Sequence, residues 1–315
     1  MLELPDSWVW DFWFAQDGDQ YHLFFLYASR ALHDPGRRHG RASVGHAVSD
    51  DLRSWTRLPD ALVRGDAPAF DDAATWTGSV VRGPEGKWHM FYTGASARDG
   101  VFIQTIGLAT SGDLISWEKY DGNPVVSADP RWYEKYDGTS WFDEAWRDPW
   151  VFADPDGDGW HMLITGRANY GPVDDRGVVG HARSRDLLQW EVQPPLSEPG
   201  AGFGHLEVFQ VEVVEERVVL LFNCLRSELS AAKKEISDSG GVWSLIADSV
   251  TGPFDLSKAT PLTDDSLYVG RLVRDCDGAW VLLAFHNEGP DGFIGSISDP
   301  MPVFLGDYGL TLQQG

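Results

Sequence analysis

The sequence predicts an all-β fold: a single five-bladed β-propeller over residues 1–315, with four-stranded antiparallel blades around a central channel. Three observations support this prediction: a short motif that recurs five times, a β-rich run in front of each copy, and the lack of sustained helical periodicity. A unit of a few strands cannot bury both of its faces alone. Five such units are therefore expected to stack side by side around an axis.

The recurring motif is clearest in three copies. It reads G-H-A-V-S-D-D-L-R-S-W at 45–55, G-L-A-T-S-G-D-L-I-S-W at 107–117 and G-H-A-R-S-R-D-L-L-Q-W at 180–190. Weaker copies stand at 243–249 and 294–300. Self-similarity at a roughly constant spacing is the sequence signature of a repeat architecture.

A run of apolar and aromatic residues precedes each motif and is expected to form a strand. The five runs lie at 21–27, 88–94, 160–166, 218–223 and 280–285. Gly, Asp and Pro residues precede most of these runs, and this composition is typical of hairpin turns. The segments before those turns, around Asp11, Gly78, Asp148, Glu207 and Tyr268, are therefore expected to be the innermost strands, which line the channel.

Composition limits the classes of partner. The 15 Trp and 34 Gly suit sheets joined by tight turns, and Trp also stacks well on the apolar face of a sugar. With 25 basic and 48 acidic residues the formal charge is −23, which repels nucleic acid and anionic lipid surfaces. We expect neither nucleic acid nor a membrane as a partner. The start of the chain as given lacks a signal peptide pattern, so a cytoplasmic protein is expected.

Three carboxylates are expected to meet in the channel. They are Asp11 in W-D-F-W, Asp148 in W-R-D-P and Glu207 in H-L-E-V-F, each from a different blade. A pair of carboxylates that flanks a glycosidic bond is the usual equipment for cleaving it: one attacks or activates water, and the other protonates the leaving oxygen. We expect the shared cavity to keep the acid neutral and the nucleophile ionised, and Arg147 to keep Asp148 ionised.

The expected ligand is a carbohydrate. A sugar offers an apolar ring face to aromatic side chains and hydroxyls to polar ones. The candidate substrate-binding residues are Trp10, Trp13, Trp76, Ser79, Arg147, His205 and Tyr268. We expect no cofactor.

No metal site is expected either. The stretch D-P-D-G-D-G at 154–159 resembles the start of a calcium loop, but Thr165 stands where the closing glutamate belongs, so a hairpin turn is predicted. His22, His89 and His161 recur at one strand position, which indicates packing. Cys224 and Cys276 are too few for a disulfide framework, and two buried thiols are expected.

Several segments resemble a known group of enzymes. The stretch at 45–62 is very similar to the corresponding part of glycoside hydrolase family 32, the invertases and inulinases. W-T-G-S-V-V at 76–81 and W-R-D-P at 146–149 are similar to two further signatures of that family. V-W-D-F-W at 9–13 instead resembles family 68, the levansucrases, which share the five-bladed propeller.

The resemblance implies a role for each acid. Asp11 would be the nucleophile, Asp148 would bind sugar hydroxyls in the transition state, and Glu207 would be the general acid/base of a reaction with retention of configuration. The chain also departs from family 32: Phe12 and Trp13 replace the usual Asn-Asp-Pro-Asn-Gly turn, and no trailing β-sandwich is expected.

The sequence therefore predicts a glycosidase that releases terminal β-fructofuranosyl units from sucrose or short fructans with retention. The alternatives are an arabinofuranosidase or xylosidase of the inverting family 43 type, a fructosyltransferase, and a carbohydrate-binding propeller without catalysis. The separation of the two working carboxylates distinguishes the enzymes, at about 5–5.5 Å for retention and about 6.5–9.5 Å for inversion.

Overall fold

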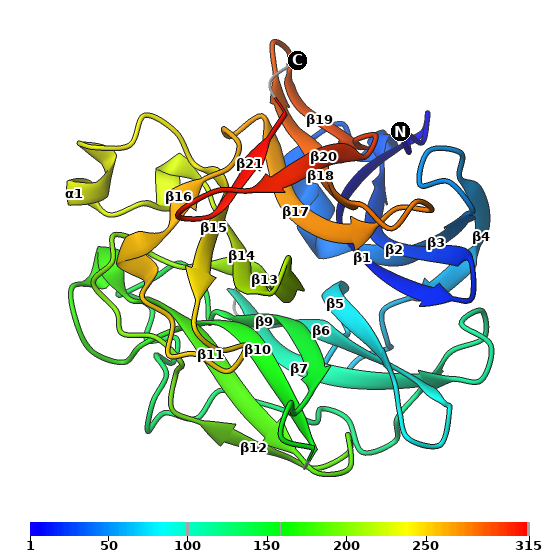
Figure 1. The fold of residues 1–315 in the computed structure, drawn as a ribbon. Helices are drawn as coiled ribbons and strands as arrows, with labels where there is room; N and C mark the ends of the chain where they lie inside the picture. The colour runs from blue at the N-terminus through cyan, green and yellow to red at the C-terminus, as the bar shows by residue number, and fades with distance from the viewer. Residues whose placement is uncertain (99–100, 158, 314–315) are drawn as a thin grey trace.

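Five antiparallel sheets surround a central channel in the computed structural model, which describes residues 1–98, 101–157 and 159–313 (Figure 1). This arrangement confirms the predicted five-bladed β-propeller. In each blade the chain runs outward from the innermost strand through adjacent hairpins, so neighbouring strands are almost always consecutive in sequence. The five innermost strands therefore start at the same end of the channel.

The strands of the first two blades are β1 (Ser7–Asp17), β2 (Gln20–Ser29), β3 (Ser43–Ser49) and β4 (Thr56–Leu62), then β5 (Ala74–Arg82), β6 (Trp88–Arg98), β7 (Val101–Ser111) and β8 (Glu118–Lys119). The third and fourth blades consist of β9 (Trp146–Ala153), β10 (Trp160–Arg167), β11 (Gly177–Ser184) and β12 (Trp190–Gln193), then β13 (Glu207–Val214), β14 (Arg217–Cys224), β15 (Gly241–Ala247) and β16 (Thr260–Pro261).

The fifth blade has an additional strand. Its path is β17 (Leu267–Arg274), β18 (Trp280–Gly289), β20 (Met301–Leu305) and β21 (Leu310–Leu312), and β19 (Gly292–Ile297) also pairs with β18. Leu2 pairs with Ile297 of β19 through backbone hydrogen bonds of 3.0 and 2.9 Å. The two ends of the propeller are thereby joined, and a free sheet edge is covered.

The helical segments are short and lie in the connections. They are α1 (Ala231–Lys234) and the 3₁₀ turns η1 (Arg30–Leu32), η2 (Pro35–Arg41), η3 (Val173–Asp175), η4 (Arg226–Glu228) and η5 (Leu256–Lys258). No helix in the described part of the chain is long and apolar enough to cross a membrane.

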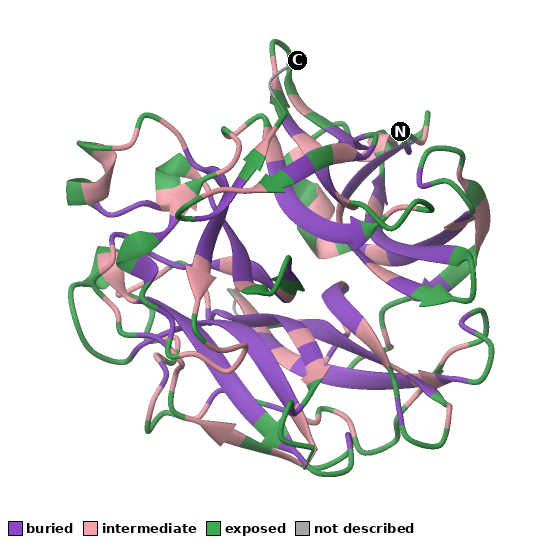
Figure 2. Cartoon of the chain, viewed as in Figure 1, coloured by how far each residue is buried: buried purple, intermediate pink, exposed green. Residues whose placement is uncertain are grey.

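The middle strands are buried on both faces because each blade packs between two others. In β2, the consecutive residues from Leu23 to Leu26 are at most 1% exposed. Figure 2 shows this pattern throughout, with burial along the strands and exposure concentrated in the loops. A continuous apolar run is what a fully buried strand requires, and it explains the β-rich runs seen in the sequence.

The recurring motif forms a turn. Asp51 accepts hydrogen bonds from the backbone N–H groups of Arg53 at 2.8 Å and Ser54 at 2.7 Å. The equivalent Asp113 and Asp186 make the same pair of contacts. The Leu after each Asp is buried with a positive φ: Leu52, Leu114 and Leu187. The repeated Asp and Leu therefore have the same structural role in all three copies: the Asp forms the turn and the Leu packs in the core.

Two of the three recurring histidines pack against a second histidine. His22 Nδ1 lies 3.0 Å from His46 Nε2, and His161 Nδ1 lies 2.9 Å from His181 Nε2. The packing role is confirmed for these two, whereas His89 contacts the carbonyl of Lys87 at 3.1 Å.

Two local predictions have different outcomes. The turn at 154–159 joins β9 to β10, as predicted; its residue Asp158 lies outside the described residues. The expectation of two buried thiols is wrong, because Cys224 is buried but Cys276 is exposed in the turn between β17 and β18.

A β-bulge interrupts every innermost strand at a similar level. The pairing shifts between Trp10 and Phe12 in β1, between Trp76 and Gly78 in β5, and at equivalent places in β9, β13 and β17. A bulge bends its strand and redirects side chains, and bulges are frequent beside active sites. Asp148, Val208 and Val269, at three of these bulges, have φ values of 59°, 55° and 51°. Positive φ is costly for a β-branched residue, so the surrounding contacts must enforce it.

Side chains from the preceding blade hold three of the bulges. Thr93 Oγ1 accepts a 2.8 Å hydrogen bond from the N–H of Asp148, and Thr165 Oγ1 accepts one of 3.3 Å from Val208. Asn223 Oδ1 accepts a 3.1 Å bond from Gly270. These acceptors recur at one position of the second strand. Blade packing and channel shape are therefore coupled.

We expect Thr165→Val to lower the free energy of unfolding by about 1–3 kcal/mol, because the Val208 N–H would lose its partner in a buried site. Urea denaturation followed by Trp fluorescence measures this change. The control is Thr110→Val, since Thr110 is half-buried on β7 and its hydroxyl has no partner among the described residues. Equal stability of the two variants would contradict the bracing role.

Candidate functional site

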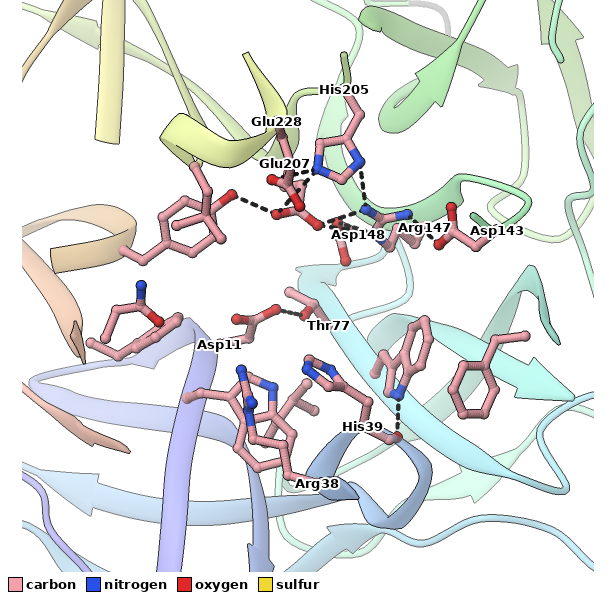
Figure 3. A pocket seen from close by; sticks show the side chains of 18 of the residues that line it. Asp11, Arg38, His39, Thr77, Asp143, Arg147, Asp148, His205, Glu207 and Glu228 are labelled. Carbon is pink, nitrogen blue, oxygen red and sulfur yellow. Dashed lines mark hydrogen bonds and ion pairs between the residues drawn. The ribbon is translucent and has the colours of Figure 1, made fainter. Parts of the chain in front are cut away.

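A cavity of about 400 Å³ opens where the N-terminal halves of the five innermost strands converge. Each strand contributes a polar side chain at or beside its bulge: Asp11, Thr77, Asp148, Glu207 and Tyr268. The three carboxylates predicted to meet do line one cavity, and Figure 3 shows them around a common space. Because the bulges lie at one level, residues far apart in sequence face each other.

Arg147 is the centre of the polar network on one wall. Its Nη2 lies 2.6 Å from Glu207 Oε1 and 3.1 Å from His205 Nδ1. Its Nη1 lies 3.1 Å from Gln104 Oε1 and 3.3 Å from Asp143 Oδ2. The side chain is 7% exposed. A buried guanidinium with this many acceptors can stabilise several carboxylates at once.

Asp11 lies on the opposite side of the cavity from this network (Figure 3). Its Oδ2 accepts a 2.5 Å hydrogen bond from Thr77 Oγ1. Burial raises the pKa of Asp11 to about 6, the hydrogen bond from Thr77 opposes this rise, and the charge of Glu207 adds to it. Asp11 is thus half-ionised slightly below neutral pH in the ligand-free cavity.

Asp148 does not titrate as the sequence predicted. Burial raises its pKa to about 7, although Arg147 and a 2.9 Å hydrogen bond from Thr165 lower it. Arg147 lies 3.5 Å from Asp148, farther than from Glu207, because its guanidinium is directed toward Glu207. The expectation that Arg147 keeps Asp148 ionised is therefore wrong for the ligand-free state.

Glu207 is the most acidic of the three. Burial raises its pKa, but His205, Arg147 and Tyr268 together lower it to about 2. The Tyr268 hydroxyl donates a 2.5 Å hydrogen bond to Oε2. The sequence predicted a higher pKa for the acid, Glu207, than for the nucleophile, Asp11. The ligand-free cavity has the reverse order of pKa values, because the hydrogen-bond donors gather around Glu207 rather than Asp11.

Five of the seven candidate substrate-binding residues line the cavity: Trp10, Trp76, Arg147, His205 and Tyr268. Trp13 and Ser79 do not, and their prediction is wrong. Trp13 is fully buried and stacks on Phe24 at a centroid distance of 6.1 Å. Ser79 Oγ accepts a 3.1 Å hydrogen bond from the N–H of Val151 in the next blade. Both residues lie beyond the bulge of their strand, where side chains pack between blades.

Sequence reasoning missed a second group of lining residues. They come from the connections or from outer strands: Leu26, Gly36, Arg38, His39, Phe102, Phe142, Asp143, Leu225, Glu228, Phe285 and Asn287. Leu26 and Phe285 belong to the recurring β-rich runs, where the repeat indicates burial, and the residues from the connections carry no repeat pattern. One available signal was the length of the connections at 30–42, 120–145 and 225–240, since long loops on a rigid scaffold often carry function.

His205, Glu207 and Glu228 have potential ligand atoms within 4.8 Å of one another. A cation does not fit well between them, because Arg147 already contacts both His205 and Glu207 and places positive charge there. The absence of a metal and of a cofactor stays a prediction.

Comparison with known proteins identifies the family. The profile of the glycosyl hydrolases family 32 N-terminal domain matches residues 13–240, more than half of the chain. The chain therefore belongs to glycosyl hydrolase family 32. The matched range begins just after Asp11 and includes Asp148 and Glu207.

Curated relatives are longer than this chain. Beta-fructofuranosidase 1 of Zea mays is 30% identical over 206 residues, which are 63% of this chain and 28% of that protein. A bifunctional fructosyltransferase of Allium cepa is 35% identical over 115 residues, which are 35% of this chain and 17% of that protein. The chain thus spans less than a third of the length of these relatives.

Solved structures share the fold at low sequence identity. A GH32 beta-fructofuranosidase of Bombyx mori superposes with a TM-score of 0.74 and 23% identity, over 99% of this chain and 64% of that one. Inulosucrase from Halalkalicoccus jeotgali, solved with bound kestose, has a TM-score of 0.78 and 20% identity, over 98% and 90% of the two chains. These similarities agree with the propeller architecture.

We expect Thr77→Val to raise the pKa of Asp11 further above 6, because the hydrogen bond that the Thr77 hydroxyl donates favours the ionised carboxylate. A ¹³C NMR titration of the aspartate carboxyls, with Asp11→Asn used for assignment, measures the shift. Thr110→Val is the control. An unchanged or lower pKa in Thr77→Val would contradict the assigned cause.

Proposed function

We propose that this protein hydrolyses terminal β-fructofuranosyl units of sucrose or short fructans with retention of configuration. The observation that carries the proposal is the convergence of Asp11, Asp148 and Glu207 in one cavity of a family 32 chain. At about 400 Å³ the cavity is near the small end of ligand pockets. It suits one terminal sugar and part of the next unit, rather than an internal stretch of a polymer.

In the proposed first step, an Asp11 oxygen forms a bond to the anomeric carbon of the fructosyl unit. The bond from that carbon to the bridging oxygen breaks, and Glu207 transfers its proton to this oxygen. In the second step Glu207 removes a proton from water, the water oxygen bonds to the anomeric carbon, and Asp11 is released. Two displacements at one carbon restore the original configuration. Asp148 accepts hydrogen bonds from ring hydroxyls and strengthens them as charge develops.

This mechanism requires a proton to relocate when substrate binds. In the empty cavity Asp11 has a pKa of about 6 and Glu207 one of about 2, so Asp11 takes up a proton before Glu207 does. The first step needs the reverse. His205, Arg147 and Tyr268 hold Glu207 ionised, and Arg147 and Tyr268 can donate to sugar hydroxyls instead. Loss of their hydrogen bonds would raise the pKa of Glu207.

Fructosyl transfer is the second candidate function. It is supported by the similarity to the fructosyltransferase of Allium cepa and to the inulosucrase fold. Transfer shares the first step and differs only in whether a sugar hydroxyl or water attacks the fructosyl-enzyme. The ratio of released fructose to released glucose from sucrose separates the two, because transfer retains fructose in longer products.

The first test compares Asp11→Asn with Glu207→Gln on sucrose and on a fructofuranosyl fluoride. Fluoride leaves without protonation, so fluoride release in the first turnover should persist in Glu207→Gln, while sucrose hydrolysis falls by about 10²–10⁴-fold. Asp11→Asn should lose both activities. Rapid-mixing assays of fluoride and fructose release make the comparison.

Reversal of the two patterns would exchange the roles of Asp11 and Glu207. Release of arabinose or xylose from aryl furanosides or xylosides, with no fructose from sucrose or fructans, would replace the proposal by the family 43 type of activity. Binding of sucrose without any turnover would favour a carbohydrate-binding propeller.

The pH profile of sucrose hydrolysis should depend on both carboxylates. Activity should fall below about pH 6, because Asp11 must be ionised and burial raises its pKa to about 6. Activity should also fall at higher pH, because Glu207 must be protonated. Tyr268→Phe removes a donor that lowers the pKa of Glu207, so the alkaline limb should move to higher pH while the acid limb stays.

The control for this measurement is Tyr170→Phe, which removes an equivalent Tyr–Glu hydrogen bond at the surface, to Glu198. Profiles of kcat at saturating sucrose from pH 4 to pH 9 would decide, because kcat reports the substrate complex, in which Glu207 has taken up its proton. A downward shift of the alkaline limb in Tyr268→Phe would contradict the role of Tyr268.

A further inference from the structure

The wall behind Glu207 is the region where a leaving group must lie. In the proposed reaction Asp11 attacks from one side of the anomeric carbon, and the departing oxygen lies on the other side, next to Glu207. Figure 3 shows Glu228 and His205 beyond Glu207, on the side away from Asp11. Phe142 and Asp143 also line the cavity. None of these residues is needed for the bond-breaking step.

Glu228 is held by a buried histidine. His205 Nε2 lies 2.8 Å from Glu228 Oε2, and the His205 side chain is 1% exposed. Arg147 Nη2 donates to Nδ1 at 3.1 Å, so a proton of the ring lies on Nε2, which faces Glu228. Burial lowers the pKa of His205, but the charges of Glu228 and Glu207 outweigh burial and raise it. The contact is a close ion pair rather than an aligned hydrogen bond, and it holds one oxygen of Glu228 against the buried ring.

The second oxygen of Glu228 is available to a ligand. The side chain is 20% exposed, it lines the cavity, and Oε1 has no hydrogen-bond partner among the residues that the structure describes. Phe142 is 61% exposed and lines the same cavity. A fixed carboxylate together with an exposed aromatic ring is the combination that recognises a sugar.

The charges on this wall are negative. Glu228 and Asp143 both line it, and Arg147 is already shared among Glu207, Asp143, Gln104 and His205. Two further basic side chains of the cavity, Arg38 and His39, come from η2 on the Asp11 side, and His39 is neutral near pH 7 because burial lowers its pKa to about 3. The cations on this wall, Arg147 and His205, are already paired with Glu207, Asp143 and Glu228, so an anionic leaving group would meet two carboxylates without an unpaired cation beside it.

We propose that Glu228, positioned by His205, binds hydroxyls of the leaving sugar and excludes leaving groups that carry a negative charge. Glu228 is thereby a specificity-determining residue, and His205 is a positioning residue. The inference rests on the proposed fructosidase function and assigns its substrate class: fructosides whose leaving unit is a neutral sugar.

The test uses three substrates: sucrose, sucrose phosphorylated on carbon 6 of its glucosyl unit, and a fructofuranosyl fluoride, whose leaving group is no sugar. The wild type should prefer sucrose to the phosphorylated form by more than about tenfold in kcat/KM. In Glu228→Gln this preference should shrink. The ratio of kcat/KM for sucrose to that for the fluoride should fall about tenfold, since a charge-assisted hydrogen bond to the leaving sugar is lost.

Two further variants sharpen the result. His205→Gln should lower the same sucrose-to-fluoride ratio, because Glu228 loses its fixed orientation. Glu235→Gln is the matched control. Glu235 is an exposed glutamate in the connection between β14 and β15 that also carries Glu228, and it does not line the cavity. It should leave all three rates unchanged.

An equal loss on all three substrates in Glu228→Gln would show that Glu228 supports the fold. An equal loss on sucrose and its phosphorylated form, with the fluoride spared, would show that Glu228 supports Glu207 as the acid. Either result would overturn the inference. So would an undiminished preference against the phosphorylated substrate. Failure of the proposed function is recognised separately, because the wild type would then release fructose from neither sucrose nor the fluoride, and the inference would fall with it.

Discussion

The β-bulges of the innermost strands are the constraint on which the cavity depends. A regular strand would alternate its side chains between the two neighbouring blades. The bulges at Asp11, Thr77 and Asp148, and those of β13 and β17, instead place a polar residue at one level of the channel. Three bulges contain residues with positive φ, and Thr93, Thr165 and Asn223 brace them from the preceding blade. Packing between blades thus sets the geometry of the site.

The second constraint on the cavity is the electrostatic repulsion among its three carboxylates. Three carboxylates in one cavity would repel each other strongly if all were ionised, and burial increases that cost. The protein meets it with buried Arg147 beside Glu207, with Arg38 and Arg271 near Asp11, and with hydroxyl donors from Thr77, Thr165 and Tyr268. The donors are distributed unequally, so Glu207 is strongly acidic while Asp11 and Asp148 have pKa values of about 6 and about 7. As the pH falls, the two aspartates of the ligand-free cavity therefore take up protons before Glu207 does.

This unequal distribution links binding to chemistry. The groups that hold Glu207 ionised, His205, Arg147 and Tyr268, line the cavity and are also sugar-binding candidates. A substrate that recruits them changes the protonation of Glu207 by the same contacts that bind it. On the far side of Glu207, His205 and Glu228 extend the network toward the cavity wall, so one chain of contacts runs from Asp143 through Arg147 and His205 to Glu228.

The sequence by itself determined the propeller, the order of its strands and the three acids, because these depend on local patterns: turn residues, buried apolar runs and a repeat that occurs five times. It also pointed to Arg147, His205 and Tyr268, which lie beside those acids or on an innermost strand. Only the tertiary structure decided which side of a bulge a residue occupies, and this is why Trp13 and Ser79 were misassigned. It alone placed Arg38, His39 and Glu228, since they come from irregular connections. The order of the pKa values of the three acids could not be predicted from the sequence either, because a pKa depends on burial and on neighbours from other blades rather than on adjacent residues.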